Sequence, residues 1–562
     1  MNHDNADLNN ASEDSVLEIR SLSIVHDHGR LQKALVEDVS FSIFPGEMVC
    51  VVGESGSGKS LTSLAIMGLL QKNSLKAGSG EILICDEDVL KAAEGRLRAM
   101  RASTMGMIFQ EPMTALNPVQ RVGEQIDEVL RIHGRWNKQE RRAKIFEMLE
   151  SVHLPEPGRI YNSYPHQLSG GQRQRVVICI ALILKPKLLI ADEPTTALDV
   201  TTQKQILMLV RELQEKHNTA VLFITHDFGV VAEIADRIVV MKSGRVVESG
   251  SRSDILARPR HPYSRMLVSA VPSLVPIQRT ANEEAIVLDV RGLKKTYLEK
   301  GLFRAARSVA AADDINFVLR RGEILGIVGE SGSGKSTVAR CIARLIDPSA
   351  GSIEAQGEDV VVAKREALRM ARKHIQIVFQ DPYRSLNPRI RVGDSIVEGL
   401  LNFGTSRNVA MTKARDLLEI VGLDASALNR YPHQFSGGQR QRICIARALA
   451  LDPQILIADE AVSALDVSVQ AQVLALLEEI RTRIGIAVLF ITHDLRVAAQ
   501  ICDTLIVMNH GTVVEVGPAQ QVLTNPRHDY TKRLIESAPG RHWDFQNFRE
   551  LPNIPSDQPR AH

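Results

Sequence analysis

The sequence predicts an α/β protein made of two similar domains in tandem. Segments recur at one fixed offset: Ser-Gly-Gly-Gln at 169–172 returns at 436–439, and Ala-Asp-Glu at 191–193 returns at 458–460. Both pairs are 267 residues apart (436 − 169 = 267). Apolar runs rich in β-branched residues alternate with helical patterns in each half, which is typical of a parallel sheet flanked by helices. A period this long indicates a duplicated domain and not a solenoid.

The repeat sets the expected domain boundaries. We predict the first domain over residues 17–272 and the second over 286–540. The segment 273–285 is assigned as a short linker, because it follows one proline, contains another and shows little periodicity. Residues 1–15 and 541–562 read as poorly ordered tails.

A helical subdomain is expected inside each sheet domain. Charged stretches with helical periodicity, such as 138–153 and 412–421, lie between the glycine-rich loop and the Ser-Gly-Gly-Gln segment of each half.

Composition and charge exclude several classes of protein. The 562 residues include 68 basic and 66 acidic side chains, a balance that does not suggest a nucleic-acid surface. The six cysteines form no CxxC pair and no metal spacing, which fits a reducing compartment. The polar N-terminus resembles no signal peptide. The longest apolar stretch, 176–184, is far shorter than the roughly 18–20 residues of a membrane span, so we expect no membrane crossing.

The sequence Gly-Glu-Ser-Gly-Ser-Gly-Lys-Ser occurs twice, each time directly after an apolar run. A strand that turns through glycines into a helix, with a lysine at the turn, binds phosphate through backbone N–H groups and the helix N-terminus. We expect the lysines to reach the β- and γ-phosphates of a nucleotide, and the final serines to ligate Mg²⁺. The residues predicted to bind ATP here are Gly53, Glu54, Ser55, Gly56, Ser57, Gly58, Lys59 and Ser60, and Gly329, Glu330, Ser331, Gly332, Ser333, Gly334, Lys335 and Ser336.

Two apolar runs end in paired carboxylates. Asp192 and Asp459 are predicted to hold Mg²⁺, because a charge at the end of a buried strand needs a partner. Glu193 and Glu460 are predicted to polarise the attacking water as general bases. A helix cap would explain either residue alone, but it explains poorly both residues in both halves.

A histidine and a glutamine complete each predicted site. His226 and His493 follow apolar runs at the edge of the sheet where α/β proteins bind ligands, and we expect them to contact the γ-phosphate. Gln110 and Gln380 follow other apolar runs and are predicted Mg²⁺ ligands. Spacing alone leaves open that each glutamine is a simple loop amide.

Each Ser-Gly-Gly-Gln segment precedes an arginine-rich helix and offers a second N-terminus suited to an anion. Each half already has a phosphate-binding loop, so a second anion site has no evident use there unless it binds the nucleotide held by the other half. The residues concerned are Ser169, Gly170, Gly171 and Gln172, and Ser436, Gly437, Gly438 and Gln439.

Together these motifs resemble the ATPase domains of ABC transporters, over both predicted domains. The resemblance implies two P-loop NTPase domains in tandem, each with a RecA-like sheet core, antiparallel β-strands and an inserted helical subdomain. It also implies Ala-Leu-Asp loops at 197–199 and 464–466. In that family two domains pair head to tail, so Ser436 is expected to face the ATP on Lys59, and Ser169 the ATP on Lys335.

The segments 109–118 and 192–199 are similar to the first ATPase of dipeptide and oligopeptide importers, and 379–388 and 459–466 to the second. Fused pairs of this kind resemble the ATPases of glutathione and Yej-type peptide importers. The resemblance implies ATP hydrolysis coupled to uptake of peptides or peptide-like solutes. It implies as partners two membrane permease subunits and an extracytoplasmic solute-binding protein, with no nucleic acid. The expected location is peripheral, on the cytoplasmic face of the inner membrane.

The chain departs from the family pattern at two points, which concern the stacking of adenine and the expected metal cofactors. Tyr297 fits the aromatic residue that stacks on adenine, whereas the first half has His26 at that position, a weaker platform. Some relatives carry an iron–sulfur centre on cysteines of the C-terminal extension. This chain has no cysteine between Cys179 and Cys341 and none after Cys502, so we expect ATP and Mg²⁺ but no iron–sulfur cluster or zinc.

Two alternatives stay open at this point. A soluble tandem ABC ATPase could act on ribosomes or DNA, although the short linker, balanced charge and lack of zinc-binding cysteines count against it. One half could bind ATP without hydrolysing it, although both halves keep the same motif residues. The sequence does not name the transported solute or the permeases, and the direction of transport follows from the resemblance alone.

Overall fold

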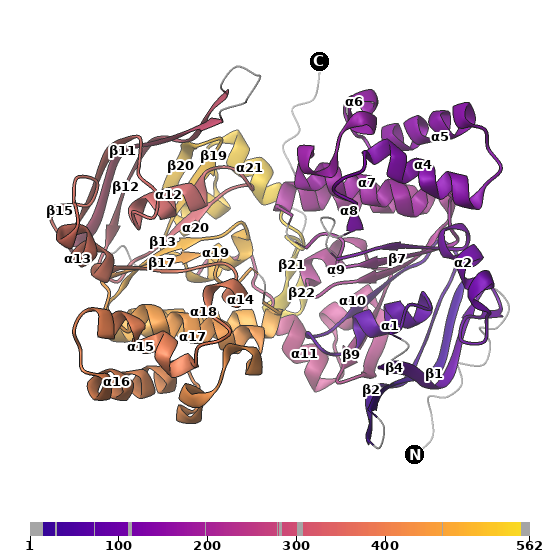
Figure 1. Cartoon of the computed structure of the whole chain (residues 1–562), viewed down its shortest axis with the longest axis horizontal. Helices are drawn as coiled ribbons and strands as arrows, with labels where there is room; N and C mark the ends of the chain where they lie inside the picture. The colour runs from indigo at the N-terminus through magenta and orange to yellow at the C-terminus, as the bar shows by residue number, and fades with distance from the viewer. Residues whose placement is uncertain are drawn as a thin grey trace. The chain divides into compact units, whose positions relative to one another are not determined.

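The computed structural model describes residues 15–28, 31–71, 74–110, 115–196, 198–277, 279, 284–299, 307–463 and 465–551. The chain divides into two compact units, Met1–Ser269 with Asn547–His562, and Ala270–Gln546. The first unit includes residues 17–269 of the first predicted domain, and the second includes the predicted domain 286–540 (Figure 1). The finer boundaries at 17–272, 273–285 and 286–540 stay predictions.

The first unit begins with two long strands and carries the glycine-rich loop, Gln110, the Ser-Gly-Gly-Gln segment, the paired carboxylates and His226. Its elements are β1 (Leu17–His28), β2 (Leu31–Ile43), β3 (Met48–Val52), α1 (Lys59–Ile66), β4 (Leu75–Ile84), β5 (Glu87–Asp88), α2 (Glu94–Ser103), β6 (Met105–Ile108), α4 (Val122–His133), α5 (Lys138–Ser151), α6 (Pro157–Asn162), η1 (Pro165–Gln167), α7 (Gly170–Leu182), β7 (Leu188–Asp192), α8 (Val200–His217), β8 (Ala220–Ile224), α9 (Phe228–Ile234), β9 (Arg237–Lys242), β10 (Arg245–Ser251), α10 (Arg252–Ala257), α11 (Pro262–Ser269) and, near the C-terminus, β22 (Arg549–Glu550).

The second unit repeats this order. Its elements are β11 (Ile286–Glu299), β12 (Arg307–Arg320), β13 (Ile324–Val328), α12 (Lys335–Ile342), β14 (Ala350–Ala355), β15 (Glu358–Asp359), α13 (Glu366–His374), β16 (Ile375–Val378), α14 (Pro382–Ser385), α15 (Val392–Asn402), α16 (Arg407–Ile420), η2 (Ala425–Asn429), η3 (Pro432–Gln434), α17 (Gly437–Leu449), β17 (Ile455–Asp459), α18 (Val467–Ile484), β18 (Ala487–Ile491), α19 (Leu495–Ile501), β19 (Thr504–Asn509), β20 (Thr512–Pro518), α20 (Ala519–Thr524), α21 (Asp529–Glu536), β21 (Trp543–Asp544) and η4 (Phe545–Asn547), which reaches the unit boundary.

Each unit has two sheets, which confirms the predicted α/β fold with antiparallel strands added. In the first unit the described strands form a sheet of order β10-β9-β3-β8-β7-β6, parallel except for its β9–β10 edge, and an antiparallel sheet of order β2-β1-β4-β5. The second unit has the same two sheets, β16-β17-β18-β13-β19-β20 and β12-β11-β14-β15. Strands β3, β7 and β8 are buried at every residue, because both faces of a parallel sheet are covered. This explains why they read as continuous apolar runs.

The core of the first unit lies between its two sheets. Alternate residues of the central parallel strands, such as Val49 and Val51 on β3 and Leu222 and Ile224 on β8, pack in one cluster with Ile19 of the antiparallel sheet. A corresponding cluster fills the second unit. Because successive strand residues face opposite sides, this core fixes the register in which the strands present their carboxyl ends.

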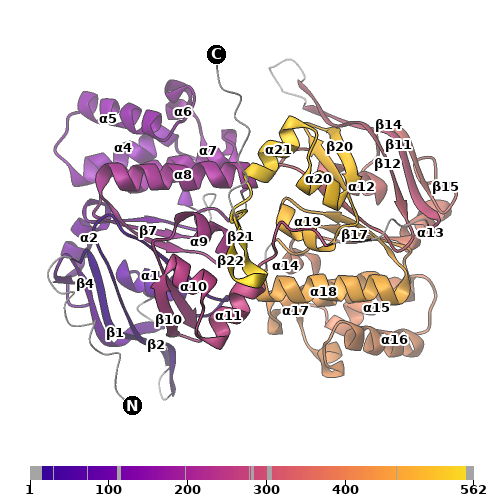
Figure 2. The same ribbon diagram turned by 180° about the vertical axis from the view of Figure 1, so that it is seen from behind.

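The inserted helices form the predicted subdomain. In the first unit α4 contacts α5, α6 and α7, and in the second unit α15 contacts α16 and α17 (Figure 2). Asn137 starts α5 by accepting hydrogen bonds from the amides of Gln139 and Glu140 at 2.9 and 3.0 Å, and the Glu140 carboxylate accepts one from the Asn137 amide. No helix in the described part of the chain is long and apolar enough to span a bilayer.

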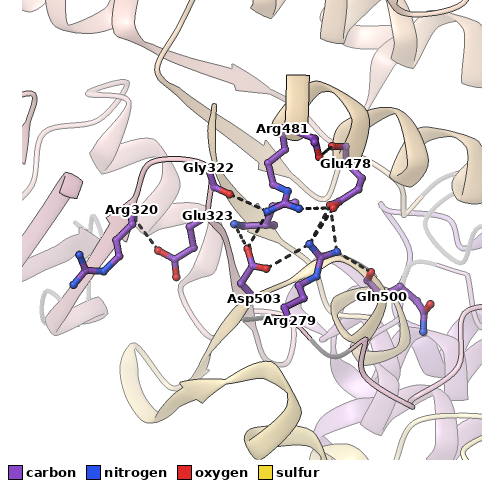
Figure 3. Close-up of polar contacts among 10 residues, drawn as sticks. Arg279, Arg320, Gly322, Glu323, Glu478, Arg481, Gln500 and Asp503 are labelled. Atoms are coloured by element: carbon purple, nitrogen blue, oxygen red, sulfur yellow. Dashed lines mark hydrogen bonds and ion pairs between the residues drawn. The ribbon is translucent and has the colours of Figure 1, made fainter. Parts of the chain in front are cut away.

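The predicted linker falls within the second unit, and Ser273, Ile277 and Arg279 bond to other parts of that unit (Figure 3 shows Arg279). The Ile277 amide donates to the Ala499 carbonyl at 3.2 Å, and the Gln500 side chain donates to the Ser273 carbonyl at 3.0 Å. Arg279 forms ion pairs with Glu478 on α18, at 3.1 Å, and with Asp503 before β19, at 3.4 Å. This part of the linker is therefore bonded to the rest of the second unit.

The first unit makes the equivalent contact without a linker. Arg211 of α8, 267 residues before Glu478 (478 − 211 = 267), forms an ion pair with Asp236 at 3.2 Å. Asp236 and Asp503 both accept a hydrogen bond from the first amide of the phosphate-loop strand, at 2.8 and 2.7 Å. In the second unit the linker residue Arg279 therefore takes the place of Arg211, and Arg481 of α18 lies 3.9 Å from the same Asp503 carboxylate.

The C-terminal segment differs from the expectation. Residues 541–551 include β21, η4 and β22, so the prediction that 541–562 is poorly ordered is wrong for these residues. The aromatic side chains of Trp543 and Phe545 are buried, which stabilises a segment that is otherwise mostly polar. Residues 552–562 and 1–14 lie outside the described part of the chain.

Candidate active sites for nucleotide hydrolysis

Each glycine-rich loop connects a buried strand to a helix, as predicted. In the first unit β3 ends at Val52 and α1 begins at Lys59. Gly53 has φ 153° and Gly58 has φ 101°, conformations that side chains disfavour. A Cβ atom on Gly53 would also collide with the carbonyl oxygen of Met241. The glycines therefore shape a backbone cradle at the helix N-terminus.

The loop lysine is buried and bonded to its own loop. Lys59 is 6 % exposed, and its ammonium donates to the carbonyls of Gly53 at 2.7 Å and Glu54 at 3.0 Å. Its counterpart Lys335, 4 % exposed, donates to the two corresponding carbonyls at 2.8 Å each. A buried cation held over a cradle of amide groups is suited to a polyphosphate.

A hydroxyl and a carboxylate meet beside each lysine. Ser60 donates to Asp192 at 3.2 Å, and Ser336 donates to Asp459 at 2.8 Å. Burial raises the pKa of both aspartates, against the opposing effect of these hydrogen bonds. Hydroxyl and carboxylate oxygens are ligands that Mg²⁺ accepts alongside phosphate oxygens, and a cation there would favour the ionised aspartate.

The predicted base of the first unit, Glu193, is at the centre of a polar group. Its carboxylate accepts hydrogen bonds from Gln110 at 2.8 Å and Thr196 at 3.1 Å, and lies 3.0 Å from Nδ1 of His226. Burial raises the pKa of Glu193, but the contacts with His226 and Thr196 and the charge of Lys59 lower it to about 2 overall. The carboxylate therefore stays ionised at neutral pH.

The second unit repeats this group with one difference. Gln380 donates to Glu460 at 2.7 Å, and His493 Nδ1 lies 3.4 Å from the same carboxylate. Burial raises the pKa of Glu460, but His493 lowers it below its usual value overall. Ser463, which takes the place of Thr196, donates to the Glu460 main-chain carbonyl at 3.0 Å and not to its carboxylate. The two bases are thus held differently.

The backbone contributes to the placement of both bases. Glu193 and Glu460 have φ of 48° and 50°, in the left-handed region. Each glutamate amide donates to the end of the neighbouring strand, Ile224 O at 2.9 Å and Ile491 O at 3.0 Å. This turn directs the carboxylate toward the histidine that follows that strand.

The Ser-Gly-Gly-Gln segments begin helices α7 and α17 with the same capping box. The Ser169 hydroxyl accepts from the Gln172 amide at 3.3 Å, and the Gln172 side chain accepts from the Ser169 amide at 3.1 Å. Both capping serines, Ser169 and Ser436, are exposed. A Cβ atom on Gly171 would lie 2.6 Å from a methyl group of Thr202, so close packing against α8 requires glycine there.

Three of the arginines that follow these segments, Arg175, Arg440 and Arg442, have structural partners. Arg175 donates to the Val152 carbonyl at 2.6 Å and to Gln205 at 3.0 Å. Arg442 makes the equivalent contacts in the second unit. Arg440 lies over the ring of Tyr383, 4.0 Å from its centroid.

The residues considered for adenine stacking occupy equivalent strand positions. Ile19 of β1 pairs with Ile82, and Val290 of β11 makes the equivalent pair with Ile353. His26 and Tyr297 each lie seven residues after that paired residue on the same strand. Tyr297 is 40 % exposed, and the Lys295 ammonium lies 5.2 Å from its ring centroid.

The structure therefore brings together six of the predicted residues in each unit: Lys59, Ser60, Gln110, Asp192, Glu193 and His226, and Lys335, Ser336, Gln380, Asp459, Glu460 and His493. Within the described residues of the first unit, no recorded hydrogen bond joins Ser169 to this group. Ala197 and Ala464 of the Ala-Leu-Asp loops lie outside the described residues. The sequence reasoning missed Thr196, although a hydroxyl three residues after a glutamate is a recognisable signal.

The motifs and their geometry define an ATP-binding and ATP-hydrolysing protein, and comparison with known proteins identifies the family. The chain belongs to the ABC transporter family, whose model matches residues 36–196 and 312–463. A second family model, "Oligopeptide/dipeptide transporter, C-terminal region", matches residues 247–295 and 514–562.

Relatives cover nearly the whole chain. It is 45% identical to the glutathione import ATP-binding protein GsiA of Pectobacterium atrosepticum, over 94% of this chain and 90% of that protein. It is 46% identical to GsiA of Salmonella choleraesuis, over 93% and 89%. It is also 46% identical to the peptidoglycan transport ATP-binding protein YejF of Agrobacterium fabrum, over 93% and 96%.

Proposed function

We propose that this chain powers the uptake of peptides or peptide-like solutes of the dipeptide, oligopeptide and glutathione class. The observation that carries this proposal is the oligopeptide/dipeptide transporter C-terminal region, which recurs in both halves. Each copy is joined to a unit with a full set of nucleotide-site residues. The names of the relatives, which refer to glutathione import and peptidoglycan transport, support the same solute class.

The reaction is Mg²⁺-dependent ATP hydrolysis at both sites. The loop lysine and amides hold the β- and γ-phosphates, and Ser60, Asp192 and Gln110 would supply oxygen ligands that fit Mg²⁺. A bound Mg²⁺ would neutralise charge on the phosphates. Glu193 orients and polarises the attacking water, and His226 contacts the γ-phosphate. The second unit uses its corresponding residues.

The ATP sites are composite, because the exposed Ser-Gly-Gly-Gln helix starts add an anion site that neither half needs alone. Ser436 faces the ATP on Lys59, and Ser169 the ATP on Lys335. A cysteine pair tests this arrangement in a chain whose two catalytic glutamates are replaced by glutamine to hold ATP. Ser55→Cys with Ser436→Cys forms an ATP-dependent disulfide, whereas Ser55→Cys with Ser169→Cys, in the same half, does not. The reverse pattern refutes head-to-tail pairing.

Membrane partners convert this hydrolysis into transport. Two permease subunits bind the ATPase at the cytoplasmic face of the inner membrane, and an extracytoplasmic binding protein delivers the solute. Proteoliposomes that contain the chain with the permeases of its own gene neighbourhood test the proposal. ATP-dependent uptake of labelled peptide or glutathione is expected, and its loss in the Lys59→Ala, Lys335→Ala variant is the control. Purification with ribosomes or DNA and never with permeases contradicts the proposal.

A further inference from the structure

A tyrosine from the C-terminal region of each half reaches the phosphate loop. Tyr263 on α11 accepts a hydrogen bond from the Glu54 amide at 3.2 Å and donates one to the Glu54 carboxylate at 3.2 Å. Tyr530 on α21 accepts from the Glu330 amide at 3.1 Å. The two tyrosines are 4 % and 5 % exposed. Each tyrosine and the loop it contacts belong to the same unit, and each contact is made to the second residue of the loop.

A glutamate on the preceding strand holds each tyrosine in place. Glu248 on β10 accepts from the amides of Arg260 and His261 at 2.7 and 3.1 Å. Nδ1 of His261 then accepts from the Tyr263 amide at 3.1 Å, which starts the helix that carries the tyrosine.

The second half repeats this relay of contacts. Glu515 accepts from the amides of Arg527 and His528 at 2.8 and 3.1 Å, and Nδ1 of His528 accepts from the Tyr530 amide at 3.1 Å. Burial raises the pKa of Glu515, but hydrogen bonds from the Arg527 amide and other neighbours lower it overall, so the ionised form is favoured. A packing aromatic residue needs no such relay, so the repetition indicates that the position of the hydroxyl matters.

The contact matters because the loop binds phosphate with its backbone. Amide groups that must converge on an anion stabilise it best when they are already ordered. The Tyr263 hydroxyl accepts from the Glu54 amide and also holds the Glu54 carboxylate, a negative charge in the loop that would bind a triphosphate.

We propose that Tyr263 and Tyr530 are positioning residues for ATP hydrolysis, which order the phosphate loop through Glu54 and Glu330. The C-terminal region of each half thus forms part of its own nucleotide site. This inference rests on ATP binding alone and is independent of the transported solute.

Phenylalanine at these positions keeps the ring and removes only the hydroxyl. In the full chain, Tyr263→Phe with Tyr530→Phe is expected to raise the KM for ATP about threefold to tenfold, the range of one lost hydrogen bond, with kcat changed less than twofold. The affinity for ADP, measured by calorimetry in the same variant, falls by a similar factor. Tyr161→Phe on α6 removes a hydroxyl from the helical subdomain and serves as the matched control, with KM unchanged.

Three results overturn the proposal. The first is an unchanged KM and ADP affinity in the double phenylalanine variant. The second is a lower melting temperature with a proportional loss of kcat at constant KM, which indicates a packing role alone. The third is an equal rise in KM for Tyr161→Phe, which shows that the effect is not specific to the loop.

Discussion

The linker arginine offers a sharp test of how the second unit is stabilised. Arg279 is 15 % exposed and pairs with Glu478, which is 36 % exposed, and with Asp503, which is 12 % exposed. Exposed ion pairs contribute about 0–1 kcal/mol, whereas breaking a buried pair costs about 3–5 kcal/mol. Asp503 keeps its hydrogen bond from the Ile324 amide when Arg279 is removed. We therefore expect Arg279→Ala to lower the stability of the second unit by about 1–2 kcal/mol.

Thermal unfolding and hydrogen exchange measure this loss. For a unit of this size, the change corresponds to a fall of roughly 2–8 °C in the melting temperature of the second unit. The Ile277 amide, which donates to Ala499, reports directly on the linker and should exchange faster in Arg279→Ala. Unchanged melting and unchanged exchange at Ile277 refute the reasoning.

The residues of the first unit suggest substitutions that should restore the stability lost in Arg279→Ala. It has Arg211 and Gln214 where the second unit has Glu478 and Arg481, and Gln214 donates to the Gly46 carbonyl. Converting Glu478→Arg and Arg481→Gln in the Arg279→Ala chain therefore installs the arrangement of the first half. Stability should return. Glu478→Arg alone should lower it, because Arg279, Arg481 and the new arginine then share Asp503 as their carboxylate partner.

The same pair has a defined pH dependence. Burial raises the pKa of Glu478, but hydrogen bonds from Arg279 and Arg481 lower it below its usual value overall. A carboxyl with a depressed pKa stabilises the fold above its unfolded pKa of about 4.3, and this contribution is lost as the pH falls through the folded value. The difference in stability between the native chain and Arg279→Ala should be full at pH 7 and shrink below about pH 4. A difference that grows on acidification contradicts the ion pair.

Three further tests concern the nucleotide sites. Glu193→Gln and Glu460→Gln should each lower phosphate release by at least half, and together by about 10²-fold or more, because each removes a general base; loss of all turnover from one change and none from the other contradicts two active sites. Ser60→Ala should raise the Mg²⁺ concentration needed for half-maximal turnover, and an unchanged requirement argues against this ligand. His26→Tyr should tighten ATP binding about threefold to tenfold if it reproduces the ring of Tyr297, and equal affinity argues against adenine stacking there.

Features set by neighbouring residues were predictable from the sequence. The glycine spacing between Val52 and Lys59 predicts the turn, since it requires conformations that only glycine adopts readily. The pair Ser169 and Gln172 predicts a helix start, because the capping box is a local structure.

Contacts between distant residues were not predictable in the same way. Gln110 and Glu193 are 83 positions apart, and Tyr263 is 209 positions from Glu54. The order of strands in the sheet brings these residues together, and no local pattern encodes that order. Comparison of the two halves could have predicted the ion pair of the linker. Arg211 of the first half corresponds to the oppositely charged Glu478 of the second, which therefore needs a cation from another part of the chain.

Because this cation comes from the linker only in the second half, the two halves differ in where the chain can be divided into fragments without losing the ion pair. A fragment that ends after α11 keeps Arg211 and every described contact that arginine makes to Asp236. A fragment that begins at the first strand of the second domain, near residue 286, loses Arg279 and leaves Glu478 and Asp503 with only Arg481 among their recorded arginine partners. Anyone dividing the gene to study one ATPase at a time should therefore give residues 270–285 to the second half.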